Sequence, residues 1–187
     1  MTRRGVLGLL ASSCGIMLLS GCNTFGPSSF HYKMTIDVRT DEGVKSFSSV
    51  RAVTYSSQLN GGYSARAEGE AVILDLPGGP VFALMTGADG DVNYAAIIAG
   101  AVLKSELQPG GANRNYVAGQ FAEIYPTTPK IQYYMPKDPL PMLVRFGDIN
   151  DPTSIERVDP ASVGITRVTI ERTSERMTTG IEKRLAW

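Results

Sequence analysis

An unbroken alternation of apolar and polar residues over positions 30–39 limits what this chain can fold into. A period of two places the apolar side chains, beginning with Phe30, on one face of a β-strand and the polar ones on the other. Residues 40–43, Thr-Asp-Glu-Gly, are typical of a turn, and residues 44–55 again contain Val, Phe, Ser and Thr. The pattern predicts an antiparallel hairpin with one face in a core.

A second hairpin and one helix are predicted in the middle of the chain. The Pro-Gly-Gly-Pro of residues 77–80 separates two further apolar runs, 71–76 and 81–85, and marks a chain reversal. Asp91 can cap a helix near 92–107, which is rich in Ala and Leu and is followed by Pro109. This apolar stretch is too short to span a membrane and is typical of a buried core helix.

The rest of the chain favours strands. Residues 113–138 contain several prolines and allow at most one or two short strands. Three later strands are predicted at 142–146, 155–158 and 165–172, and residues 178–187 are expected to lie on the body through Ile181, Leu185 and Trp187. The fold class predicted is mainly β (α+β): an antiparallel sheet of hairpins with one inserted helix near 92–107.

The N-terminus has the features of an export signal. Arg3 and Arg4 form a basic start, and residues 5–19 form an apolar run shorter than a membrane span. Leu19-Ser20-Gly21-Cys22 resembles the lipobox of bacterial lipoproteins, in which the signal is removed and the cysteine is acylated. We therefore expect a cleaved signal over 1–21, an acylated Cys22 with a short tether over 22–29, and a single β-rich globular domain over 30–187.

Acyl chains on Cys22 would anchor the protein to a membrane without spanning it, since two or three chains hold a protein far more firmly than one. Asn23 stands where Asp tends to signal inner-membrane retention in Gram-negative lipoproteins. The predicted location is the cell envelope, at the outer membrane and facing the periplasm. Cys14 is a competing acylation site, but it lacks a branched apolar residue before it. The export route, general secretory or twin-arginine, stays open.

Composition excludes several classes of function. Removal of Arg3 and Arg4 leaves 16 basic and 18 acidic side chains, a net charge of −2 that argues against nucleic-acid binding. The chain has two cysteines, one predicted to be removed and one acylated, so the folded domain would hold no disulfide. Its stability must then come from burial and backbone pairing.

The ionisable residues show no familiar catalytic or metal-binding pattern. His31 is the only histidine and lies in the polar phase of the first strand, as expected for a surface residue. The pairs Glu68 with Glu70 and Asp89 with Asp91 are interpreted as solvated loop carboxylates rather than an acid and base pair. Residues 148–151, Asp-Ile-Asn-Asp, suggest a turn bonded by its own side chains rather than a calcium loop. No catalytic residue, metal ion or cofactor is predicted.

Tyrosines among prolines are the best candidates for a binding surface. Tyr125, Tyr133 and Tyr134 lie in a stretch containing Pro126, Pro129 and Pro136. Such residues could line an aromatic groove for a glycan or an envelope protein, or could simply cover a small core.

Several sequence blocks resemble a family of uncharacterised lipoproteins from Gram-negative bacteria. They are YKMTIDVRTDEGVKSFSSV from Tyr32, GEAVILDLPGG from Gly69, DINDPTSIERVDP from Asp148 and TTGIEKRLAW from Thr178. The resemblance implies no activity. The function predicted is a membrane-anchored envelope lipoprotein with a structural or partner-binding role. The alternatives are a small-ligand carrier, which needs an apolar cavity between sheet and helix, or an enzyme of unfamiliar type, which needs a polar cleft.

Overall fold

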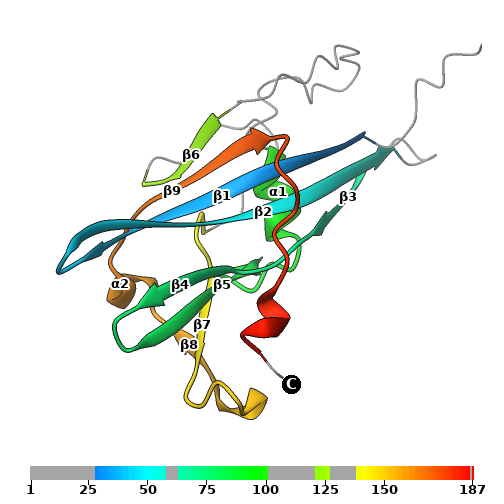
Figure 1. Cartoon of the computed structure of the whole chain (residues 1–187). Helices are drawn as coiled ribbons and strands as arrows, with labels where there is room; N and C mark the ends of the chain where they lie inside the picture. The colour runs from blue at the N-terminus through cyan, green and yellow to red at the C-terminus, as the bar shows by residue number, and fades with distance from the viewer. Residues whose placement is uncertain (1–27, 58–62, 101–120, 127–137, 186) are drawn as a thin grey trace, which may run out of the picture.

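The computed structural model describes residues 28–57, 63–100, 121–126, 138–185 and 187. This part of the chain is mainly β, with two antiparallel sheets, one of them a half-barrel, and two short α-helices (Figure 1). The predicted fold class is confirmed. Cys22, the predicted acylation site, and the candidate binding residues Tyr133 and Tyr134 lie outside the described residues.

Five strands form the larger sheet in the order β3-β2-β1-β9-β6. The long hairpin predicted from the alternating pattern lies at its centre, with Ser28 paired to Tyr55 at one end and Thr40 to Gly43 at the other. The strands are β1 (Ser28–Thr40), β2 (Gly43–Ser57), β3 (Tyr63–Glu68), β6 (Phe121–Tyr125) and β9 (Ile165–Thr173). Because β1 begins at Ser28, the predicted tether loses its last two residues and is reduced to 23–27.

Four strands form the second sheet in the order β4-β5-β7-β8. The hairpin predicted around residues 77–80 is confirmed by the antiparallel pairing of the first two. The strands are β4 (Val72–Leu76), β5 (Gly79–Gly87), β7 (Pro141–Phe146) and β8 (Ile155–Val158). Strand β3 was not predicted from the sequence, because its Tyr-Ser-Ala-Arg-Ala-Glu contains no run of apolar residues.

The structure describes two short helices, one of them within the predicted helical segment. Helix α1 (Tyr94–Ala99) lies inside the predicted segment 92–107, of which 101–107 is outside the described residues. Its N-cap is Asn93 rather than Asp91, whose carboxylate instead accepts the N–H of Asn93. Helix α2 (Pro160–Val163) was not predicted. Two single 3-10 turns complete the description, η2 (Pro152–Ser154) and η3 (Ile181–Lys183).

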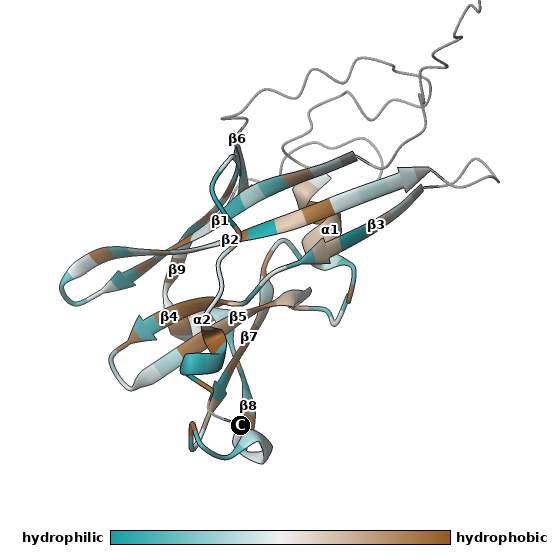
Figure 2. Cartoon of the chain, turned by 45° about the vertical axis from the view of Figure 1, so that its right-hand side comes forward, coloured by the Kyte–Doolittle hydropathy of each residue, from teal (hydrophilic) through white to brown (hydrophobic). Residues whose placement is uncertain are grey.

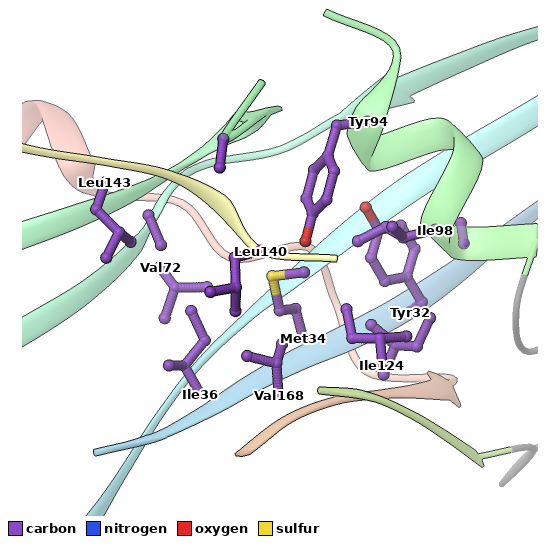
Figure 3. Close-up of a cluster of buried hydrophobic side chains, with 14 of the residues drawn as sticks. Tyr32, Met34, Ile36, Val72, Tyr94, Ile98, Ile124, Leu140, Leu143 and Val168 are labelled. Atoms are coloured by element: carbon purple, nitrogen blue, oxygen red, sulfur yellow. The ribbon is translucent and has the colours of Figure 1, made fainter. Parts of the chain in front are cut away.

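One hydrophobic core lies between the two sheets and α1. The apolar phase of β1, including Tyr32, Met34 and Ile36, is fully buried, as the alternation predicted. Side chains from β4, β7, β9 and α1 point toward the same centre (Figure 3). Hydrophilic and hydrophobic residues alternate along β1, so the outer face of the larger sheet is polar at this strand (Figure 2).

A buried arginine joins the two sheets inside this core. Arg51 stands in the inward phase of β2 and has no exposed surface. Its Nε donates to the carbonyl of Glu70 at 3.0 Å, its Nη2 to the carbonyl of Ala83 at 3.1 Å, and its Nη1 contacts the sulfur of Met34 at 3.4 Å. These partners come from β1, β5 and the β3–β4 connection, so one guanidinium satisfies polar groups from both sheets.

Candidate functional site

A C-terminal strap, residues 174–185 and Trp187, leaves the end of β9 and crosses to the four-stranded sheet (Figure 1). It first passes over the outer face of β1, where Glu175 binds Lys33 through its carboxylate and accepts a hydrogen bond from Nδ1 of His31 through its carbonyl. It then meets the edge of β2, where Val50 and Thr178 exchange two hydrogen bonds of 2.8 and 3.0 Å. The strap thus pairs with β2 at Val50, beyond the stretch of β2 from Ala52 to Ser57 that pairs with β3.

Two acidic side chains hold the second half of the strap. The carboxylate of Glu70 accepts the backbone N–H groups of Gly180 and Ile181 at 2.8 and 3.1 Å. Arg184 forms a two-pronged ion pair with Asp75, at 3.1 and 2.8 Å. The interpretation of Glu70 as a solvated loop carboxylate was therefore wrong, because the strap supplies donors from more than 100 positions away in the sequence.

The outer face of the four-stranded sheet is apolar beneath the end of the strap. The register pairs Phe82 with Val144 and Phe146 with Ile155, and paired residues point to the same side of a sheet. Phe82 and Val144 are 2% and 5% exposed, although they face away from the main core. The rings of Phe82, Phe146 and Trp187 form an edge-to-face row with centroid distances of 5.6 and 5.5 Å.

This row ends in an exposed apolar surface that we call the Trp187 patch, formed by Phe146, Ile155 and Trp187. Trp187 is 55% exposed and Ile155 is 51% exposed, whereas Phe146 between them is half-buried. Nε1 of Trp187 donates to the carbonyl of Ile149 at 3.0 Å, so the exposed ring is held in place by a hydrogen bond as well as by ring packing.

The loop that holds Trp187 is stiffened by its own hydrogen bonds. Asp148 accepts the N–H of Asn150 at 2.9 Å, and Asp151 accepts the N–H and the hydroxyl of Thr153 at 2.8 and 2.6 Å. The hydrogen bonds from Thr153 lower the pKa of Asp151. The hydroxyl of Ser154 closes the loop: it accepts the N–H of Asp148 at 3.0 Å and donates its one proton to the carbonyl of Asp148 or of Asp151, at 2.8 and 2.7 Å. The prediction of a self-bonded turn is confirmed.

Tyr125, the one described member of the predicted tyrosine group, lines a shallow hollow of about 480 Å³. The hollow also contains Asp138 and Asp159, each with one oxygen already accepting a nearby backbone N–H, at 2.9 and 3.0 Å. Leu140 and Ile165 add apolar surface. Sequence reasoning selected the tyrosine but not the two aspartates, which come from distant segments.

The remaining candidates have local structural roles. Asp89 accepts the N–H of Asp91 at 3.0 Å, and Glu68 pairs with the exposed Arg66. His31 is half-buried because Glu175 of the strap lies against it. Within the part of the chain that the structure describes, no group of three or more His, Cys, Asp or Glu side chains could hold a metal ion.

The patch residues were only partly accessible to sequence reasoning. The prediction that Trp187 lies on the body agrees with its contacts to Phe146 and Ile149. The strand residues Phe146 and Ile155 gave no signal that their outward side would meet a ring from the end of the chain.

Among the described helices, none is long and apolar enough to cross a membrane.

Comparisons of this chain with protein families, with curated proteins and with solved structures gave no match.

Proposed function

We propose that this chain is a lipoprotein of the bacterial cell envelope, anchored by acyl chains on Cys22 and facing the periplasm from the outer membrane, whose β domain binds a partner protein. The lipobox-like Leu19-Ser20-Gly21-Cys22 supports the anchoring part. The partner-binding part rests on one observation, the exposed but fixed Trp187 patch.

The patch has the properties of a binding hot spot. Trp is among the residues that contribute most to protein interfaces, and an aromatic side chain held rigid before binding loses little entropy on binding. Trp187 is held by the Phe146 ring and by the carbonyl of Ile149, and Ile155 extends the apolar area beside them. An apolar surface of this kind on a small domain is a site of association.

The carrier alternative requires an enclosed apolar cavity between sheet and helix, and in the described part of the chain side chains fill the interior beneath α1. The hydroxyl of Tyr32 donates to the carbonyl of Ala95 at 2.8 Å, and the buried Ile98 packs in the same cluster (Figure 3). Burial raises the pKa of both Tyr32 and Tyr94, with the Arg51 guanidinium opposing the shift. The interior here supports a structural core rather than a ligand chamber.

An affinity pull-down of the acylated protein from crosslinked native membranes tests the proposal. We expect the partner to be lost when Trp187 is replaced by Ala, because truncating a hot-spot residue costs about 2 kcal/mol or more of binding free energy. Val44→Ala is the matched control, since Val44 is exposed and lies in the β1–β2 hairpin. Equal recovery with W187A and wild type, or repeated recovery of no partner, would contradict the proposal.

The hollow at Tyr125 supports a second candidate partner, a glycan. An aromatic ring offers a stacking surface for the C–H face of a sugar, and the free oxygens of Asp138 and Asp159 can accept hydroxyl protons. Titration of the domain with soluble cell-wall glycan fragments tests this. By isothermal titration calorimetry, we expect binding that Tyr125→Ala abolishes and Trp187→Ala leaves intact. If the wild-type domain gives no heat of binding, the glycan is removed as a candidate.

A further inference from the structure

We infer that the end of the domain formed by the start of β1, by β3 and by α1 rests on the lipid surface, with Val92 at the point of contact. The inference rests on the anchor of the proposed function, and it adds the orientation of the domain and the residues that meet lipid.

The first step is the length of chain between the anchor and the fold. Five residues, 23–27, separate Cys22 from Ser28, where β1 begins. Fully extended, this connection spans roughly 20 Å. Strand β1 itself is 13 residues long. At about 3.4 Å per residue, its two ends lie roughly 40 Å apart. The start of β1 must therefore stay close to the bilayer, whereas the β1–β2 turn can lie far from it.

The second step is what surrounds the start of β1. Ser28 pairs with Tyr55 and Tyr55 pairs with Ala65, so β3 lies two strands, roughly 10 Å, from the tether junction. The hydroxyl of Tyr55 donates to the carbonyl of Ala96 at 2.7 Å, which places α1 at the same end. Both views show α1 beside β3 and the first half of β1 (Figure 1, Figure 2).

The third step is the chemistry of this end. Val92 is 78% exposed, the most exposed large apolar side chain among the described residues. It borders a hollow of about 210 Å³ that is lined by apolar side chains and by the polar Arg66 and Asn93; the apolar ones are Ala65, Ala67, Met85, Ala95 and Ala96. Arg66, Asp89 and Asp91 nearby carry mixed charge, so the contact does not depend on anionic lipid. An apolar side chain at a short distance from an acyl anchor can enter the headgroup boundary, which adds affinity to that of the anchor.

Site-specific labelling of the full acylated chain tests this orientation. Because the predicted mature chain has only the acylated Cys22, Val92→Cys and Val44→Cys each introduce one free thiol for an NBD fluorophore. Val44 is the matched control, since it is also an exposed valine, at 61%, and lies next to the β1–β2 turn. The labelled proteins are placed on phosphatidylcholine vesicles with and without doxyl-labelled lipid.

We expect the label at residue 92 to shift to shorter wavelength and to be quenched by doxyl lipid at least about twofold more than the label at residue 44, because interfacial groups lie only roughly 5–10 Å deep. Equal quenching at both positions, as for a domain lying on its side, would overturn the inference, as would no quenching at residue 92. Vesicle flotation separates the two proposals. If the wild-type chain floats with vesicles no better than Cys22→Ala does, the proposed anchor is wrong. If the wild-type chain floats but the label at residue 92 is not quenched, only the proposed orientation is wrong.

Discussion

The outer faces of the two sheets are built in opposite ways. On the five-stranded sheet, the face turned from the core is polar, and Asp37 is satisfied there by Ser46 at 2.6 Å and by Arg167 at 2.8 Å. On the four-stranded sheet, the corresponding face carries Phe82 and Phe146, and Trp187 at the end of the strap packs against Phe146. On the first face, Asp37 is satisfied by neighbouring strands of the same sheet, and the strap adds only polar contacts at His31 and Lys33. On the second face, the apolar surface is extended by a ring from the end of the chain.

This difference shows how the strap works. It crosses the polar sheet through hydrogen bonds and an ion pair, which keep its direction, and it reaches the apolar sheet with an aromatic ring. Polar contacts at the surface contribute little free energy but specify geometry, while burial of apolar surface contributes most of the stability. The polar contacts with the five-stranded sheet therefore set the path of the strap, and the packing of Trp187 on the four-stranded sheet contributes more of its stability.

Truncating the apolar outer face gives the largest expected effect. Phe82→Ala removes a ring that is 2% exposed and should lower the free energy of unfolding by about 3–5 kcal/mol. Ser48→Ala, on the exposed outer face of β2, should change it by less than about 0.5 kcal/mol. Urea unfolding followed by circular dichroism measures both. Similar losses in the two variants would mean that the faces do not differ as described.

Removing the charge that receives the strap should have an intermediate effect. Glu70→Gln keeps the shape of the side chain but turns an amide toward one of the two N–H groups, at Gly180 and Ile181. A partly buried donor left without an acceptor costs about 1–3 kcal/mol. Faster hydrogen exchange at these two amides, measured by NMR, would report release of the strap. Unchanged protection would show that the strap is held elsewhere.

The buried Tyr94 in the core between the sheets should make the free energy of unfolding depend on pH in the alkaline range. Burial raises the pKa of Tyr94 above its ordinary value of 10.0, and its hydroxyl donates to the carbonyl of Pro139 at 2.8 Å. Because the folded pKa is the higher one, this contribution is complete below pH 10 and is lost as the pH rises above it, where the unfolded chain releases the proton.

Tyr94→Phe tests that effect. The variant should lose about 1 kcal/mol at neutral pH through the missing hydrogen bond. It should also show a shallower loss of stability above pH 10 than wild type, as measured by chemical unfolding from pH 7 to 11. Parallel pH profiles for the two proteins would contradict the assignment to Tyr94.

Among the contacts of the strap, the smaller effect on stability is expected at the surface ion pair. The side chains of Asp75 and Arg184 are each about half exposed. Asp75→Asn should therefore cost less than about 1 kcal/mol, and the difference from wild type should shrink further in high salt. A loss as large as that of Glu70→Gln would mean that this pair, rather than Glu70, positions the strap.

Sequence reasoning worked where a local period carried the information. The alternation from Phe30 predicted β1 and its buried face, and Pro77 to Pro80 predicted the second hairpin. It failed at β3, where Tyr63, Ala65 and Ala67 alternate with polar residues but two of the three apolar side chains are small alanines. It also gave no sign that Ser49 would be 2% exposed and donate to the carbonyl of Glu70 at 3.2 Å. Arg51 could have been noticed, because an arginine in the apolar phase of β2 implies buried partners.

The sequence by itself determined the mainly β fold and the central hairpins, and it predicts the acylated Cys22 and its short tether, because hydrophobic period, turn residues and sorting motifs are all local patterns. Only the tertiary structure decided that Glu70 receives the strap, that Arg51 joins the sheets and that Trp187 is fixed by Phe146 and by the carbonyl of Ile149. Those roles depend on which donor, acceptor or ring arrives from a distant segment, and a local pattern contains no information about that partner.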